Sequence, residues 1–177
     1  MYLIIDKIKE KILRHYRKKV FLLRIKSNNN SVNIIGKVYV NATNVKIGNN
    51  VTIYPGVMFW GDGEIVIGNN VDIGKDTIIF AKKGVTIGND VAIAAQCYII
   101  DSNHGIEKNT LIRNQPLDYH ERIYIGNDVW IGAGCKILKG SIIQDGAVIG
   151  AMSLVNKEIN NNAVAYGIPA KIIKFRQ

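Results

Sequence analysis

One histidine stands where a regular sequence pattern breaks. His104 lies in the stretch CYIIDSNHGIEKN, residues 97–109, between segments that repeat a common phrase. A neutral imidazole titrates close to neutral pH, so it can take the proton from a hydroxyl group as that group attacks a carbonyl carbon. The neighbouring Asp101 and Asn103 could orient the imidazole or contact a substrate, and D-S-N is also ordinary turn chemistry. His104 is therefore a candidate general base, and the alternative is a turn histidine that faces water.

The other residues with chemical potential form no comparable group. His120 lies in LDYHERI and His15 in a basic N-terminal stretch, so the histidines lack the arrangement of a three-histidine zinc site. Cys97 and Cys135 occupy equivalent repeat positions without CxxC spacing, which favours packing over catalysis. We therefore expect no metal centre and no disulfide framework.

The pattern around His104 is a tandem repeat. It reads VKIGNNV, IVIGNNV, VTIGNDV and IYIGNDV from residues 45, 65, 85 and 123. Large aliphatic residues recur every six positions, as at Ile67, Ile73 and Ile79, so three sixes make one turn. Such a turn directs its aliphatic side chains into a triangular prism whose faces are short, stacked parallel strands. The repeat predicts an all-β parallel β-helix.

The interval that contains His104 is longer than one turn. Ile87 and Ile125 are 38 residues apart, whereas Ile67 and Ile87 are 20 apart. Ile99 still fits the pattern, so the extra residues must leave the prism within residues 103–122. A protruding loop of this length in a compact domain is usually functional.

Positive charge is concentrated at the N-terminus. The 177-residue chain has a formal net charge of +9, and residues 1–26 hold nine Lys and Arg against Asp6 and Glu10, or +7. Apolar residues in this segment recur at nearly helical spacing, at Ile5, Ile8, Ile12, Tyr16 and Val20. We expect a basic amphipathic helix that packs over one end of the prism. Contact with an anionic membrane surface or an acidic glycan is the alternative.

Composition narrows the class of protein. Hydrophobic residues make up 47% of the chain, yet no apolar run reaches the roughly 18 residues of a membrane span, and a signal-peptide core is not evident. Residues 27–177 are nearly charge-balanced and show no nucleic-acid recognition motif. The sequence predicts a cytoplasmic protein with a basic helix at 1–26, a β-helix domain at 27–177 and no nucleic-acid partner.

The repeats, together with DSNHG, VWIGAGCKILKGSIIQDGAVIGAMSLVNKE and VAYGIPAKII, resemble the hexapeptide-repeat acyltransferases. Among these, the chain is similar to acetyl-CoA-dependent sugar and polysaccharide O- and N-acetyltransferases, over residues 34–176. The resemblance implies a left-handed β-helix, a homotrimer of parallel prisms, acetyl-CoA as co-substrate and a sugar acceptor. His104 matches the general base of these enzymes.

The resemblance also implies binding residues. In the family, coenzyme A lies between adjacent prisms along the C-terminal turns. The matching positions run from small residues beside the pantetheine arm to cations at the phosphates: Ala133, Ala151, Asn156, Lys157, Lys171 and Lys174. Arg113 resembles an arginine that follows the catalytic histidine in several relatives, although the spacing is longer here, and it joins Asp101 and Asn103 as a candidate acceptor contact. Galactoside acetyltransferases place an asparagine where this chain has Gly74, so their acceptor contacts do not transfer directly.

The implied activity is acetyl transfer to a hydroxyl or amine of a sugar or polysaccharide precursor, in capsule, O-antigen or exopolysaccharide modification. Two alternatives belong to other classes. One is a non-catalytic β-helix scaffold that binds a partner. The other is a zinc enzyme like the γ-carbonic anhydrases, which share the prism but need three converging histidines.

Overall fold

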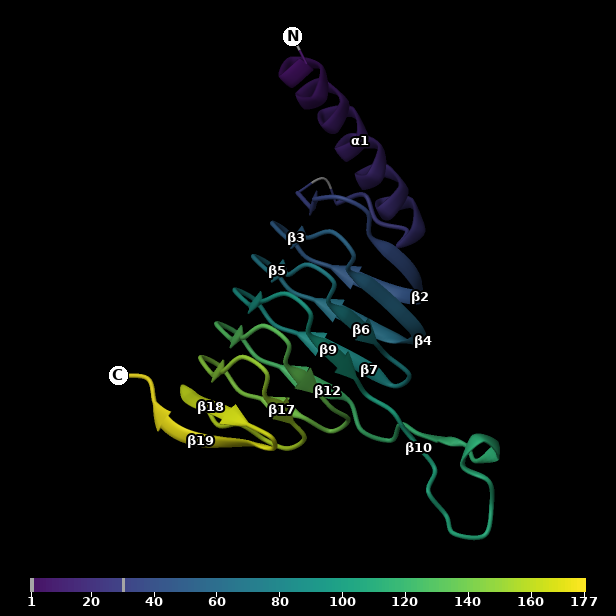
Figure 1. Cartoon of the computed structure of the whole chain (residues 1–177), viewed down its shortest axis with the longest axis vertical. Coiled ribbons are helices and arrows are strands. Elements are labelled where there is room, and N and C mark those ends of the chain that lie inside the picture. Colours follow the sequence, from purple (N-terminus) through teal and green to yellow (C-terminus); the bar gives the residue numbers. More distant parts are fainter. Residues whose placement is uncertain (1, 30) are drawn as a thin grey trace.

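The chain forms a β-helix with one long helix at its N-terminal end (Figure 1). The computed structural model describes residues 2–29 and 31–177, with side chains from residue 5 onward. Its parallel strands stack into a β-solenoid of about 7 turns, which fits a left-handed β-helix. The predicted fold class is confirmed.

One face of the prism is a sheet of eight strands in the order β1-β3-β5-β8-β13-β16-β18-β19. Neighbouring strands are parallel except for the last pair, which is an antiparallel hairpin at the C-terminal end. The strands are β1 (Asn33–Ile34), β3 (Thr52–Ile53), β5 (Asp72–Ile73), β8 (Ala92–Ile93), β13 (Trp130–Ile131), β16 (Val148–Ile149), β18 (Ala163–Gly167) and β19 (Ala170–Phe175).

The other two faces are joined by strand β4 (Met58–Ile67), which runs through a corner of the prism. Its first residues pair with β6 and its last with β7, while β2 runs alongside it. The second face continues from β6 to β9, β14 and β17, and the third from β7 to β12 and β15. These strands are β2 (Tyr39–Ile47), β6 (Ile78–Phe80), β7 (Gly84–Ile87), β9 (Tyr98–Ile100), β12 (Ile123–Ile125), β14 (Lys136–Ile137), β15 (Ile142–Ile143) and β17 (Leu154–Val155).

The strand register follows the aliphatic repeat. Ile53, Ile73, Ile93, Ile131 and Ile149 pair in succession on one face, and each is at most 2% exposed. Burying one isoleucine side chain stabilises a fold by about 1.5–3 kcal/mol. This column of stacked isoleucines therefore contributes a large part of the stability of the core. Ile93 pairs directly with Ile131, although the loop lies between them in the sequence. The extra residues therefore leave the prism without shifting the strand register.

Polar ladders hold the corners together. The Asn69 backbone N–H donates to Asn89 Oδ1 at 2.8 Å, and the Asn89 N–H donates to Asn127 Oδ1 at 2.8 Å. The preceding glycines stack closely, because a Cβ at Gly88 would lie 2.6 Å from the Gly126 carbonyl oxygen. The recurring I-G-N phrase therefore combines a core residue, a close backbone approach and a corner hydrogen bond.

Helix α1 (Tyr2–Arg24) extends away from the prism (Figure 1). It is anchored near its C-terminal end, where Phe21 and Leu22 are buried and the Phe21 ring lies 6.1 Å from that of Phe59. The expectation that the stripe from Ile5 to Tyr16 packs over the prism is wrong, since these side chains are exposed. The helix is thus buried at Phe21 and Leu22 in its final turns, while the apolar stripe faces solvent. Within the part of the chain that the structure describes, the helices lack the combined length and hydropathy of a membrane span.

Candidate functional site

His104 lies in a hairpin that leaves the prism after β9 (Figure 1). Strand β10 (Asn103–His104) pairs antiparallel with β11 (Leu117–Asp118), and His104 lies opposite Leu117. Asn103 lies opposite Asp118 in the same ladder, and both strand β10 side chains are exposed. The loop thus holds the imidazole on a short, paired strand that is open to solvent.

Asp101 anchors the outgoing arm of the loop. Its carboxylate is fully buried and accepts hydrogen bonds from the backbone N–H groups of Lys82, Lys83 and Gly84 at 2.7, 2.8 and 2.6 Å. These three residues form the corner of the preceding turn. Both carboxylate oxygens are therefore engaged by the prism, and Asp101 fixes the backbone three residues before His104.

The returning arm is anchored by an ion pair. Asp118 accepts a hydrogen bond from Lys139 Nζ, and this contact lowers the pKa of the Asp118 carboxyl from its ordinary value. Lys139 belongs to the next turn of the prism, and Glu121 lies 3.8 Å from its ammonium group. Sequence reasoning missed Lys139, because only the fold brings it beside the loop.

The far part of the loop is closed by Gln115. Its Oε1 accepts from the Glu107 N–H at 2.7 Å, while its Nε2 donates to the carbonyls of Glu107 and Thr110 at 2.9 and 2.7 Å. The short 3₁₀ helix η1 (Ile112–Asn114) precedes it and carries Arg113 with an exposed side chain. Arg113 thus belongs to the outer part of the loop, whereas His104 is at its base.

A shallow pocket of about 350 Å³ lies beside the base of the loop. Trp60 and Phe80, which are paired residues of β4 and β6, meet there edge to face with ring centroids 5.4 Å apart. Lys82 and Asp62 add an ion pair of 2.9 Å. The remaining lining residues are Asn41, Thr43, Gly61 and Leu117.

The pocket and His104 share one side of the hairpin. Directly opposed residues of an antiparallel pair project to the same face with Cβ atoms about 5 Å apart. Since Leu117 lines the pocket, its partner His104 projects along the same face. Sequence reasoning missed this pocket, because Trp60 carries no motif and its neighbours come from successive turns.

The ion pair in the pocket keeps both partners charged. The hydrogen bond from Lys82 lowers the pKa of the Asp62 carboxyl, and the same contact raises the pKa of the Lys82 ammonium. The pocket therefore offers an aromatic edge, an amide, a carboxylate and an ammonium group. These groups could contact a small polar ligand by stacking and hydrogen bonding at this shallow surface.

The residues that the family resemblance matches to coenzyme A contacts lie in two exposed regions of the surface. Ala133 and Ala151 lie on adjacent turns, where the Met152 N–H donates to the Ala133 carbonyl at 2.8 Å. Lys157 and Lys171 line a common pocket of about 390 Å³ near the C-terminal hairpin. Asn156 directly precedes Lys157, and Lys174 lies opposite Val164 in the β18–β19 ladder, both with exposed side chains.

The cysteines are packing residues. Cys97 and Cys135 are buried at successive corners, and Cys97 Sγ lies 3.3 Å from the Gly132 carbonyl oxygen. Burial raises the pKa of the Cys97 thiol to about 11 and also raises that of Cys135, so neither is a ready thiolate. The His120 ring stacks on Tyr119. Among the described residues, no three His, Cys, Asp or Glu side chains form a group that could hold a metal ion.

Two family descriptions match parts of the repeat. Residues 122–157 match the bacterial transferase hexapeptide (six repeats), and residues 64–100 match the hexapeptide repeat of succinyl-transferase. The two matches lie on opposite sides of the loop that carries His104.

Similar proteins include several acetyltransferases. The putative lipopolysaccharide biosynthesis O-acetyl transferase WbbJ of Escherichia coli is 40% identical over 89 residues, which cover 46% of this chain and 45% of WbbJ. The galactoside O-acetyltransferase of Lactococcus lactis is 43% identical over 61 residues, covering 34% of this chain and 30% of that enzyme. The chain spans less than half the length of the curated relatives it matches.

Solved structures share the fold along most of the chain. A mutant of AntD, an N-acyltransferase from Bacillus cereus in complex with dTDP and coenzyme A, superposes with a TM-score of 0.80 at 22% identity, covering 91% of this chain and 90% of AntD. A maltose O-acetyltransferase from Clostridium difficile has a TM-score of 0.55 at 26% identity, covering 96% and 88%. The repeats and the acetyltransferase relatives support a hexapeptide-repeat acyltransferase, and the AntD structure shows that the fold is shared.

Proposed function

We propose that this chain transfers an acetyl group from acetyl-CoA to a hydroxyl group of a sugar or polysaccharide precursor, with His104 as general base. The observation that carries the proposal is the exposed His104 on a hairpin anchored at both ends beside a mixed aromatic and polar pocket. The choice of acceptor is supported by relatives named as a galactoside O-acetyltransferase and as a putative O-acetyl transferase of lipopolysaccharide biosynthesis.

The proposed reaction needs one proton-transfer group and one oxyanion donor. Neutral His104 accepts the proton of the acceptor hydroxyl as its oxygen attacks the thioester carbon. The tetrahedral intermediate collapses, breaks the carbon–sulfur bond and releases coenzyme A, whose sulfur receives the proton from the imidazolium. A backbone N–H of an adjacent turn is the natural donor to the oxyanion.

The C-terminal turns provide the proposed coenzyme A surface. Ala133 and Ala151 leave the backbone accessible to the thin pantetheine arm, and Asn156 lies farther along. Lys157, Lys171 and Lys174 bring positive charge to the phosphates. Relatives of this fold have been crystallised with coenzyme A or an acyl-CoA, which supports acetyl-CoA as co-substrate.

The pocket beside His104 provides the proposed acceptor site. The C–H face of a pyranose ring can stack on Trp60, while its hydroxyl groups reach Asp62, Lys82 and Asn41. Asn103 and Arg113 extend the acceptor surface along the loop. Asp101 acts as a positioning residue, because its buried carboxylate fixes the start of the hairpin.

We propose a cytoplasmic homotrimer. The loop projects beyond its own prism (Figure 1), so in a trimer of parallel prisms it reaches a neighbouring copy. Such a contact would complete the groove between prisms in which both substrates meet. The physiological context that fits this activity is capsule, O-antigen or exopolysaccharide modification.

A panel assay tests the function directly. Sugars, amino sugars, nucleotide sugars and glycan fragments are incubated with acetyl-CoA, and both the released coenzyme A thiol and the acetylated product are measured. We expect acceptor-dependent thiol release by the parent and its loss in His104→Ala. A parent that binds a glycan but transfers no acetyl group to any acceptor would instead indicate a scaffold.

A further inference from the structure

Helix α1 carries an exposed apolar stripe. Five large apolar side chains at spacings of three, four, four and seven residues lie on one side of the helix, and each is at least 55% exposed. The residues that anchor the helix to the prism, Phe21 and Leu22, point elsewhere. The stripe therefore has no cover within the described part of the chain, and it consists of Ile5, Ile8, Ile12, Tyr16 and Leu23.

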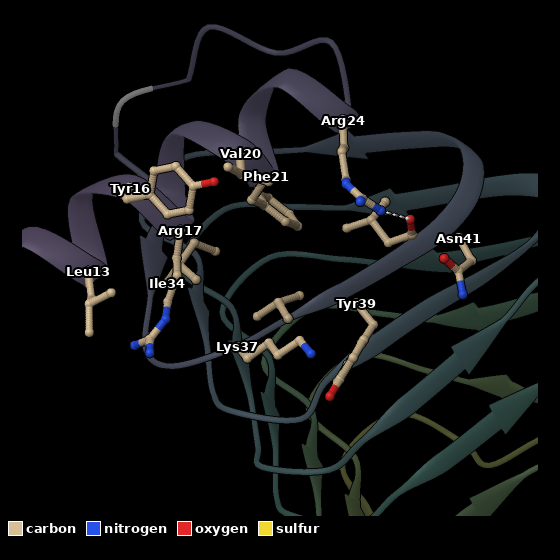
Figure 2. A pocket seen from close by; sticks show the side chains of 12 residues that line it. Leu13, Tyr16, Arg17, Val20, Phe21, Arg24, Ile34, Lys37, Tyr39 and Asn41 are labelled. Atoms are coloured by element: carbon tan, nitrogen blue, oxygen red, sulfur yellow. Dashed lines mark hydrogen bonds between the residues drawn. The ribbon is translucent and has the colours of Figure 1, made fainter. Parts of the chain in front are cut away.

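The apolar surface continues into a pocket between α1 and β2. This pocket, of about 370 Å³, has a mainly aliphatic and aromatic lining that includes Leu13, Val20 and Phe21 (Figure 2). Tyr16 belongs both to the stripe and to the pocket lining, so the two surfaces are continuous.

The rim of this pocket is basic. Arg17, Arg24 and Lys37 lie around it, with Arg24 Nη1 donating to the Val40 carbonyl at 3.0 Å (Figure 2). Arg17 has one acidic partner, Glu10, at 3.5 Å. The pocket thus combines an apolar interior with positive charge at its mouth, which suits an anionic amphiphile.

The positive charge of α1 distinguishes between three possible partners: other copies of the helix, a soluble acidic glycan and an anionic lipid surface. The 23 residues of α1 contain eight Lys or Arg and two acidic residues. A bundle of α1 helices from several copies would bring these like charges together with few acidic residues to pair with them. A soluble acidic glycan would neutralise the charge but leave the apolar stripe in water. An anionic lipid surface satisfies both features.

We infer that α1 docks on a membrane surface that contains anionic phospholipids. The stripe inserts into the boundary between headgroups and acyl chains, and Lys9 and Lys19, which flank the stripe at helical spacing, reach the headgroups. Arg17 and Lys37 contact a lipid phosphate at the mouth of the pocket. The helix lies on the membrane surface without crossing it.

Vesicle flotation of the full chain tests this inference. We expect the parent to float with vesicles of phosphatidylglycerol and phosphatidylcholine and not with phosphatidylcholine alone. Raising the salt from 0.1 to 1 M shortens the screening length from about 10 to about 3 Å, so it should reduce binding. The double variant Ile8→Asn and Ile12→Asn should lose at least about tenfold in bound fraction without a lower melting temperature, because both side chains are exposed.

Matched charge variants complete the test. Replacing Lys7, Lys9 and Lys11 by Gln should reduce flotation on anionic vesicles. The same loss of charge at Lys75, Lys83 and Lys136, on the prism, should leave flotation unchanged.

Three results would overturn the inference: no flotation of the parent, equal loss in both lysine sets, or dissociation of an oligomer by the Ile8 and Ile12 changes. The last result would assign the stripe to contact between copies. Because flotation requires no acetyl transfer, its outcome is independent of the proposed enzyme activity.

Discussion

His104 lies opposite Leu117 in the β10–β11 ladder, and Leu117 lines the pocket that contains Trp60. This pairing connects the candidate base to an aromatic surface built from earlier turns of the prism. The imidazole is held by a strand pair whose two arms are tied separately to the prism by Asp101 and Asp118. The position of the His104 imidazole therefore depends on the two anchors of the hairpin.

His104→Ala should reduce turnover by at least about a hundredfold, because no base would remain to take the acceptor proton. Folding and coenzyme A binding should be unchanged, since the side chain is exposed. Steady-state kinetics, circular dichroism and calorimetry with coenzyme A would measure these three properties. A near-normal rate would rule out the role of general base.

Trp60→Ala should raise the acceptor KM by about tenfold with little effect on the KM for acetyl-CoA, because it removes the stacking surface. Trp60→Phe should retain most of the affinity, since a ring remains. Tyr54→Ala, which removes another exposed aromatic ring of the prism, is the control. If the parent transfers acetyl groups but Trp60→Ala has the parent's acceptor KM, the acceptor binds elsewhere and the activity itself still stands.

Asp101→Ala should lower the free energy of unfolding by about 3 kcal/mol, because it leaves three backbone N–H donors without their buried acceptor. It should also reduce kcat, since the hairpin loses its first anchor. Chemical denaturation and kinetics would test both effects. Asp72→Ala removes an exposed carboxylate from β5 and serves as the control; equal stability changes in the two variants would contradict the anchoring role.

The buried thiols give a prediction about pH. The pKa of Cys97 is raised to about 11, so the folded protein should show no reaction with a thiol reagent at pH 8, whereas the denatured chain should show two reactive thiols. Between pH 9 and 11 the unfolded thiols ionise while the folded Cys97 stays protonated. Stability should therefore fall as pH rises through this range, as measured by urea denaturation at several pH values.

Sedimentation velocity at micromolar concentration should show a trimer. The exposed flat faces of the prism bury well against identical copies, and the loop extends beyond its own prism. A monomer at this concentration would exclude the site between subunits that we propose. Cross-linking at rising dilution would check that the assembly is specific.

The repeat was sufficient to predict the prism, because a period of six determines which residues are buried wherever the strands stack. Ile93 and Ile131 are 38 residues apart, so their pairing across the loop follows from the repeat once the surplus residues are placed outside the prism. The surroundings of Trp60 could not be predicted, since they depend on outward-facing residues from several turns and on the path of the loop. The exposure of Ile8 was predicted wrongly, because helical spacing defines an apolar face but not what that face contacts.

The uninterrupted register across residues 103–122 makes the hairpin a replaceable module. Each turn of a solenoid contacts only its neighbours, and Ile93 meets Ile131 as if the intervening segment were absent. Exchange of this hairpin for one of different length would alter the surface beside His104. The aliphatic repeat that determines the strand register of the prism would be unchanged. If the proposed function holds, insertion, deletion or recombination within this one loop would change the acceptor preference at little cost to the stability of the prism.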